Sequence, residues 1–314
     1  MKNIIISESG VFLGLTSALL VIKKENFKKE IALNRIKTIQ INAKGVTISS
    51  NLLFACAARG IKFFFNNSNG FYALNTVYQH KSVKVREYQY GFCNSDKSIE
   101  LAKKFITGKI KNQKSTLLYF LRGKNYDKTL IDFFNESVKE LKTAKTKEEI
   151  LGIEGMCAMN YFEILKSYSL LPESFILRTK RNSKEITNIA LNYGYAILQN
   201  FIYKSVINAG LEPYLGVLHS KRSGKPSLVL DIMEEYRSFV VDRNIIKLRS
   251  KLSKTKKFET IKKTISKNIL DTIHNRYIYN KKKITLESII QRQIYKLSGY
   301  FAGEKNYKSY VFRW

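Results

Sequence analysis

The chain has 314 residues, which is long enough for a substantial core and for two domains. Hydrophobic residues make up 44 % and charged residues 25 %, with 3 prolines and 16 glycines, so the composition excludes collagenous and low-complexity proteins and predicts a folded chain. The 55 Lys and Arg residues outnumber the 25 Asp and Glu residues, and a net charge of +30 predicts a polyanionic partner: nucleic acid first, an anionic membrane surface second.

Cysteine usage and the first apolar run bear on the compartment. Cys56, Cys93 and Cys157 are odd in number and widely spaced, so we expect neither a disulfide framework nor a thiolate zinc site, and a reducing, cytoplasmic setting. The apolar run 11–22 could pass for a signal peptide, but Glu8 precedes it, a lysine-rich segment follows it, and it is too short to cross a bilayer. We expect buried strands there and no membrane association.

Residues 1–76 are predicted to form a small β-rich domain. Apolar and β-branched runs at 2–9, 10–24 and 35–49 are interrupted by glycine turns, so hairpins are expected. A short helix is expected at 49–60, with Ser49 or Ser50 as its N-cap and Gly60 at its end. Two further strands, at 61–66 and 71–75, flank an Asn-Ser-Asn-Gly turn.

Beyond about residue 77 the apolar residues follow a helical period. This predicts a linker at 77–92 and an all-helical domain at 93–314, hence an α+β fold class in which a small β-rich N-terminal domain precedes a larger all-α C-terminal domain. The strongest helical pattern covers 182–210, where Asn182 and Glu185 form a capping pair and Gly210 marks the end.

Glu154 lies on an otherwise apolar helical stripe. A carboxylate there would lose hydration, so it must be protonated or face a cation. Gly152 and Gly155 are poor helix formers, which indicates a close approach to this helix. An ion pair with one of the many basic residues explains Glu154 as well as a functional site does. The positions that share its face are Ile150, Leu151, Ala158, Tyr161, Phe162 and Leu165.

A second acidic group follows the histidine at 219. Pro226 and Ser227 can begin a helix over 227–243, in which Asp231 and Glu234 are i,i+3 neighbours on one face. With His219 they could hold a divalent cation that suits Mn²⁺ and tolerates Mg²⁺. The alternative is that Glu234 pairs with Arg237, that Asp231 is solvated, and that His219 packs in the core.

Four segments together resemble the successive signature blocks of the CRISPR-associated integrase family called Cas-one, the nuclease of spacer acquisition. They occur in the order of that family over nearly the whole chain, and the β-rich start with a helical remainder resembles its two-domain plan. The segments are IEGMCAMNYFEIL (153–165), NIALNYGYAIL (188–198), GLEPYLGVLHSKRSGKPSLVLDIMEEYR (210–237) and YKSYVFRW (307–314).

The resemblance implies catalytic residues, a cofactor and partners. It implies that Glu154, His219 and Glu234 are metal ligands for Mg²⁺ or Mn²⁺, that Asp231 supports them, and that all four are catalytic. It also implies a homodimer formed through the β-rich domain, a small CRISPR-associated partner protein called Cas-two, and DNA as spacer precursor and CRISPR repeat. The expected activity is metal-dependent DNA cleavage and joining.

Basic residues are concentrated late in the chain. Residues 243–283 contain 14 Lys and Arg against 2 Asp and Glu, with tyrosine and phenylalanine among them, which favours a DNA-backbone surface over a merely solvated helix face. The alternative to an enzyme is a non-catalytic architectural protein that binds nucleic acid. The basic residues expected to bind DNA near the acidic groups are Arg178, Arg181, Lys221, Arg222, Lys225 and Arg237.

Overall fold

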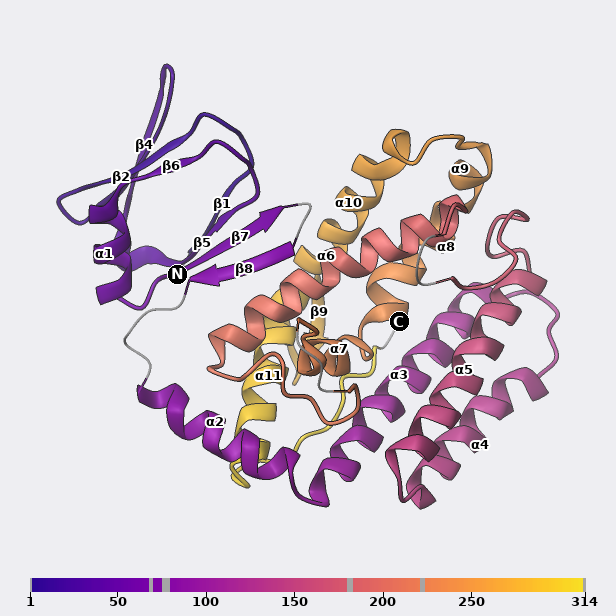
Figure 1. The fold of residues 1–314 in the computed structure, drawn as a ribbon. Coiled ribbons are helices and arrows are strands. Elements are labelled where there is room, and N and C mark those ends of the chain that lie inside the picture. Colours follow the sequence, from indigo (N-terminus) through magenta and orange to yellow (C-terminus); the bar gives the residue numbers. More distant parts are fainter. Residues whose placement is uncertain (1, 68–69, 75–79, 180–182, 221–223, 313–314) are drawn as a thin grey trace. The chain divides into compact units, whose positions relative to one another are not determined.

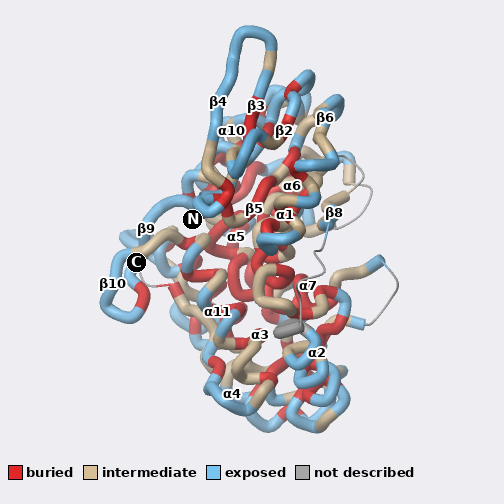
Figure 2. The backbone as a smooth tube through the Cα atoms, turned by 90° about the vertical axis from the view of Figure 1, so that its left-hand side faces the viewer, coloured by how far each residue is buried: buried red, intermediate tan, exposed pale blue. Residues whose placement is uncertain are grey.

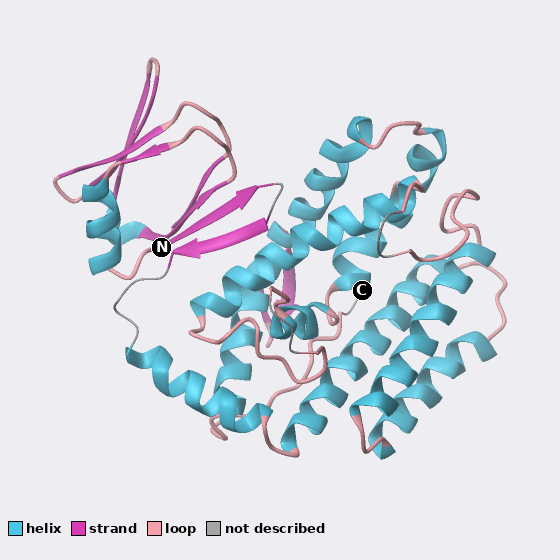
Figure 3. Ribbon diagram, viewed as in Figure 1, coloured by secondary structure: helices cyan, strands magenta, loops and turns pink. Residues whose placement is uncertain are grey.

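The computed structural model describes residues 2–67, 70–74, 80–179, 183–220 and 224–312. The chain divides into two compact units, residues 1–83 and 84–314. The division falls inside the predicted linker at 77–92, and most of that range belongs to helix α2 (His80–Cys93). Strands dominate the first unit and helices the second, as Figure 3 shows, so the predicted α+β class is confirmed.

In its described residues, the first unit contains two four-stranded sheets, one α-helix and the short 3₁₀-helix η1 (Leu33–Arg35). The strand order is β1-β5-β7-β8 in one sheet and β4-β3-β2-β6 in the other. Leu13, Leu20, Ile39 and Leu52 are completely buried in its core. The elements are β1 (Lys2–Ile6), β2 (Phe12–Thr16), β3 (Leu19–Lys24), β4 (Phe27–Ala32), β5 (Ile36–Ile41), β6 (Thr47–Ile48), α1 (Ser50–Ala58), β7 (Lys62–Asn67) and β8 (Gly70–Leu74).

The predicted strands form, but two of the predicted hairpins do not. β2 and β3 pair as an antiparallel hairpin, whereas β1 and β5 pair in parallel and β6 pairs in parallel with β2. The glycine turns before β2 and before β6 carry the chain from one sheet to the other instead of reversing it. Gly10 and Gly45 have φ angles of 74° and 70°, and the N–H of Gly10 donates to the carbonyl oxygen of Gly45 at 3.1 Å.

The helix predicted at 49–60 is confirmed as α1. The hydroxyl of Ser49 accepts a hydrogen bond from the backbone N–H of Leu52 at 3.3 Å, so Ser49 is the N-cap. Gly60 follows the helix with a φ of 67°, a conformation that other residues adopt only with strain.

The second unit is mainly helical, with one exception to the all-α prediction. Residues 276–285 form an antiparallel hairpin whose turn places Asn280 and Lys281 at positive φ. Its β-branched and aromatic residues favour a strand over a helix. The elements are α2, α3 (Lys97–Leu121), α4 (Thr129–Thr143), α5 (Lys147–Ser167), α6 (Ile186–Asn208), α7 (Ser227–Met233), a π-helix (Arg237–Asp242), α8 (Arg243–Lys247), α9 (Arg249–Lys254), α10 (Glu259–His274), β9 (Arg276–Tyr279), β10 (Lys282–Thr285) and α11 (Leu286–Phe301).

Two groups of helices in this unit position the site. Helices α3, α4 and α5 lie side by side, while α6 packs against α7, α10, α11 and the π-helix (Figure 1). Figure 2 shows the buried stretches that these helices contribute to the core. Gly194 allows α6 to approach the π-helix, because a Cβ there would lie 2.6 Å from Cγ1 of Val241. Among the described residues, no helix is both long and apolar enough to cross a bilayer.

The predicted start of one helix and the predicted length of another can be compared with the structure. Glu185 is the N-cap of α6 and accepts hydrogen bonds from the backbone N–H groups of Thr187 and Asn188, whereas Asn182, its partner in the predicted capping pair, lies outside the described residues. The helix expected over 227–243 is interrupted: α7 ends at Met233, and a turn and a π-helix follow. At this break, Glu234 pairs with Lys109 and Glu235 accepts a hydrogen bond from the hydroxyl of Tyr307. π-Helical turns often lie at functional sites.

Candidate active site

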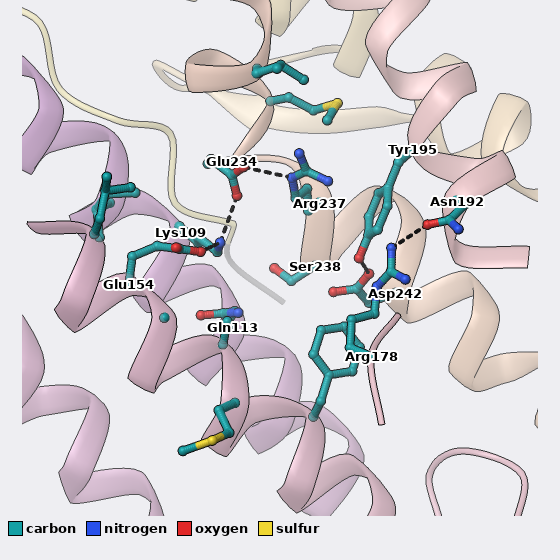
Figure 4. Close-up of a pocket in the computed structure, with 18 of the residues that line it drawn as sticks. Lys109, Gln113, Glu154, Arg178, Asn192, Tyr195, Glu234, Arg237, Ser238 and Asp242 are labelled. Atoms are coloured by element: carbon teal, nitrogen blue, oxygen red, sulfur yellow. Dashed lines mark hydrogen bonds and ion pairs between the residues drawn. The ribbon is translucent and has the colours of Figure 1, made fainter. Parts of the chain in front are cut away.

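A cavity of about 850 Å³ lies within the helical unit (Figure 4). Its lining comes from α3, α5, α6, α7, the π-helix and the two loops that precede α6 and α7. Three of the four predicted catalytic side chains, Glu154, His219 and Glu234, line it, and Asp231 lies directly behind the histidine. The fold therefore brings together acidic and imidazole groups from two distant parts of the chain.

Asp231 holds the histidine loop. It is completely buried, and its two carboxylate oxygens accept hydrogen bonds from the backbone N–H groups of Val217, Leu218 and His219 at 2.7, 3.0 and 2.9 Å. Gly216 makes this possible, since a Cβ there would lie 2.4 Å from Oδ2 of Asp231. The proposal that Asp231 is a solvated surface acid is wrong.

The same carboxylate also orients the imidazole ring. Nδ1 of His219 lies 2.7 Å from Oδ1 of Asp231. A carboxylate that receives several N–H groups acts as an acceptor, so we assign the proton to Nδ1. Nε2 faces Glu234 and lies 4.0 Å from its Oε1. Orientation of a ligand histidine through its second nitrogen is a common feature of metal sites.

Glu234 and Glu154 meet at the ammonium of Lys109. Nζ of Lys109 donates a hydrogen bond to Oε1 of Glu154 and lies 2.8 Å from Oε2 of Glu234. Arg237 adds a second cation, its Nε donating to Oε1 of Glu234 at 3.0 Å. Burial alone would raise the pKa of Glu234, but Arg237, Lys109 and His219 outweigh it and lower that pKa to about 2. The carboxylate is therefore ionised at neutral pH.

The donor set fits a divalent cation. Within the described ranges, no three His, Cys, Asp or Glu side chains already stand at metal-ligand spacing. Instead, two carboxylates face one positive centre, the ammonium of Lys109. Two carboxylate oxygens and an imidazole nitrogen are ligands that Mn²⁺ and Mg²⁺ accept.

Two guanidinium groups, those of Arg178 and Arg237, also line the cavity. Arg178 donates to Oδ1 of Asn188 at 2.9 Å and to Oδ1 of Asn192 at 2.6 Å, which fixes its direction. Its guanidinium lies 5.4 Å from the ring centre of Tyr195, and that of Arg237 lies 4.6 Å from the same ring. These fixed cations suit a phosphate in the cavity.

A buried acid supports these cations. The hydroxyl of Tyr195 donates to Oδ1 of Asp242 at 2.5 Å (Figure 4). Burial raises the pKa of Asp242 to about 6, although the hydrogen bond from Tyr195 and the nearby arginines oppose the shift. Asp242 therefore keeps a fixed tyrosine beside Arg178 and Arg237.

Comparison with known proteins identifies the family. Residues 4–279 match the family described as CRISPR associated protein Cas1. The chain is 47 % identical over 319 residues to "CRISPR-associated endonuclease Cas1 1" of Francisella tularensis subsp. novicida (strain U112), with 100 % of each chain covered. This chain belongs to the Cas1 family.

Solved structures share the Cas1 fold seen here. "Casposase bound to integration product" matches with a TM-score of 0.76 and 22 % identity, covering 98 % of this chain and 93 % of the other. "Partial Cas6-RT-Cas1--Cas2 complex" matches with a TM-score of 0.74 and 18 % identity, covering 99 % of this chain and 98 % of the other. Both likenesses concern the fold.

The other residues predicted for this Cas1 chain have mixed outcomes. Arg178, Lys225 and Arg237 line the cavity, and Arg237 also forms the predicted pair with Glu234. Apart from the adjoining residues and the nearby backbone of α5 itself, no described atom lies within 4 Å of a Cβ built at Gly152 or Gly155, so the expected close approach to α5 is absent there. Arg181, Lys221 and Arg222 lie outside the described residues.

The sequence interpretation of this Cas1 chain missed the contribution of α3. Lys109 and Gln113 are 7 % and 4 % exposed and line the cavity. A signal for them was present, because both interrupt a stripe that is otherwise apolar at every fourth position. The members of that stripe are Leu101, Phe105, Lys109, Gln113, Leu117 and Leu121.

Proposed function

We propose that this Cas1 chain is a metal-dependent DNA endonuclease and integrase of CRISPR spacer acquisition. It joins DNA 3′-OH ends to a CRISPR repeat by transesterification. The observation that carries the proposal is the placement of Glu154, Glu234 and the fixed imidazole of His219 in one cavity that also contains Arg178 and Arg237. The names of the Francisella relative, an endonuclease, and of the casposase structure bound to an integration product support the same class of chemistry.

Each group of residues has a distinct role. Glu154, Glu234 and Nε2 of His219 would hold Mg²⁺ or Mn²⁺, while Asp231 fixes the ring and the loop. A cation held by these residues would neutralise charge on the scissile phosphate, which otherwise repels a nucleophile. Arg178 and Arg237 bind phosphate oxygens and hold the strand in place. The DNA 3′-OH is the nucleophile, so the ester is exchanged and no serine or tyrosine intermediate is needed.

The proposal also includes the partners of this chain. We infer a homodimer formed through the β-rich unit, with Cas2 as the small partner protein and DNA as the substrate, acting in the cytoplasm. The net charge of +30 supports DNA as the partner, and the name of a Cas1–Cas2 complex with this fold supports Cas2.

The joining reaction gives a direct test of the proposed chemistry. Short duplexes with 3′-OH or 3′-dideoxy ends are incubated with a supercoiled plasmid carrying a CRISPR repeat, Cas2 and Mn²⁺ or Mg²⁺. We expect joined products only with 3′-OH ends and only without EDTA, because the hydroxyl is the nucleophile and the cation is required. Gel analysis of labelled duplexes measures the products.

Two outcomes would contradict this chemistry. Joining with dideoxy ends, or in both Glu234→Ala and His219→Ala, would exclude the proposed nucleophile or site. Tight DNA binding without cleavage or joining under any metal condition would favour a non-catalytic DNA-binding protein. The ion pairs of Lys109 with Glu154 and Glu234 are the contacts that such a protein would retain.

DNA affinity is expected to be mainly electrostatic. Each neutralised phosphate contributes about −0.9 to the slope of log K against log salt concentration, so about six contacts would cost about 10³-fold between about 50 and 200 mM salt. Fluorescence anisotropy with labelled duplexes of two unrelated sequences measures the slope. Equal slopes are expected, and an affinity that is independent of salt would refute an electrostatic basis.

A further inference from the structure

Lys109 is a buried cation in the middle of the acidic site. It is 7 % exposed, and it reaches the site from α3, whereas Glu154 lies on α5 and Glu234 follows α7. Its Nζ donates a hydrogen bond to Oε1 of Glu154 and lies 2.8 Å from Oε2 of Glu234, so the side chain lies between two carboxylates (Figure 4).

We propose that Lys109 is the resident counter-ion of this site, which holds Glu154 and Glu234 together in the metal-free protein and competes with the divalent cation for them. Lys109 is in this sense a positioning residue that sets the metal affinity. The metal part of this inference rests on the proposed function, whereas the counter-ion part concerns the metal-free protein alone.

The two carboxylates differ in their cationic partners. Glu234 has both Lys109 and Arg237 as cationic partners, whereas the ion pair described for Glu154 is with Lys109. Without the lysine, the carboxylates of Glu154 and Glu234 would face each other with no cation between them, and their repulsion would destabilise the protein. If the charge of Glu154 is removed as well, this repulsion is gone and Glu234 is still paired with Arg237.

Competition with a metal follows from the same geometry. The ammonium contacts the carboxylate oxygens that would be the metal ligands, and like charges a few ångströms apart repel strongly in a buried site. A divalent cation must therefore displace the ammonium from these oxygens. Removal of the ammonium should increase the affinity of the site for the metal.

The experiment uses the purified full chain and four variants: Lys109→Gln, Glu154→Gln, the double variant, and Lys103→Gln as the matched control. Lys103 is also on α3, but its ammonium contacts the exposed Glu100 and the backbone carbonyl of Lys142, and it does not line the cavity. Melting temperature is measured with EDTA, and the Kd for Mn²⁺ is measured by calorimetry. We expect Lys109→Gln to lower Tm by about 5 °C or more and to lower the Kd for Mn²⁺ at least about tenfold.

The double variant separates a counter-ion from a packing role. It should recover most of the Tm lost in Lys109→Gln, and Lys103→Gln should match the wild type in both measurements. If Lys109→Gln does not fold, recovery of folding in the double variant supports the proposal, and failure of both overturns it. Additive losses of Tm, or an unchanged or higher Kd in Lys109→Gln, also overturn it.

The two proposals can fail separately. If the wild type does not bind Mn²⁺, the metal site of the proposed function is wrong and so is the competition. The Tm values in EDTA still decide whether Lys109 is the counter-ion. If the wild type binds Mn²⁺ but the Tm losses add, the proposal for Lys109 alone is wrong.

Discussion

Replacing Glu154 with glutamine is expected to reduce DNA joining at least about 100-fold while the fold and DNA binding are retained. The amide is a poor ligand for Mg²⁺ or Mn²⁺, and the neutralisation that a bound cation supplies is worth several kcal/mol. The glutamine oxygen can still accept the hydrogen bond from Lys109, and Lys109 keeps Glu234 as its partner. DNA affinity depends on the phosphate contacts of basic residues, which this change leaves in place.

Joining rates, anisotropy titrations and melting temperature together measure this effect. Glu148→Gln is the matched control, because Glu148 is an exposed carboxylate on the same helix and does not line the cavity. We expect it to behave as the wild type in all three assays. Unchanged joining by Glu154→Gln would remove this residue from the site, and loss of folding would assign it a structural role.

Replacing Asp231 with alanine is expected to destabilise the protein by about 3 kcal/mol and to abolish joining. The change removes the acceptor of three buried backbone N–H groups and of Nδ1 of His219, and buried donors without partners are costly. It also frees the imidazole ring, and loss of such an orienting partner lowers metal affinity about 10- to 100-fold. Urea unfolding and Mn²⁺ calorimetry measure the two effects.

His219→Ala is the control that separates these effects. It removes the imidazole but leaves the three backbone hydrogen bonds to Asp231, so we expect loss of joining with most of the stability retained. Asp231→Asn should lie between the two, because an amide offers one acceptor oxygen where the carboxylate offers two. An Asp231→Ala protein with wild-type stability would contradict the assigned role of the carboxylate.

The differences between prediction and structure in the first unit have one cause. Strand positions follow from alternating and β-branched residues, so most of β1 to β8 could be located from local patterns. Pairing depends on contacts between distant segments, and β1 pairs with β5 although β2, β3, β4 and η1 (Leu33–Arg35) lie between them in the sequence. A glycine turn that reverses a strand within one sheet has the same local signature as one that moves the chain to another sheet.

In the acidic site, too, some features could be predicted from local sequence and others depend on the tertiary structure. Glu154, His219, Asp231 and Glu234 could be selected from the sequence, because their spacing and their place in the signature blocks are local properties. The support given to His219 by Asp231 could be expected, but the three backbone N–H groups that Asp231 accepts could not, since they depend on the path of the loop around Gly216.

The sequence by itself determined the α+β class, the net positive charge and the resemblance to the Cas1 family, because each follows from composition or from short segments. The tertiary structure alone decided which cation faces the acids. Lys109 is one of 55 basic residues, and only the packing of α3 against α5 and the π-helix brings its ammonium between Glu154 and Glu234. Such a contact depends on how helices pack, which a local pattern does not record.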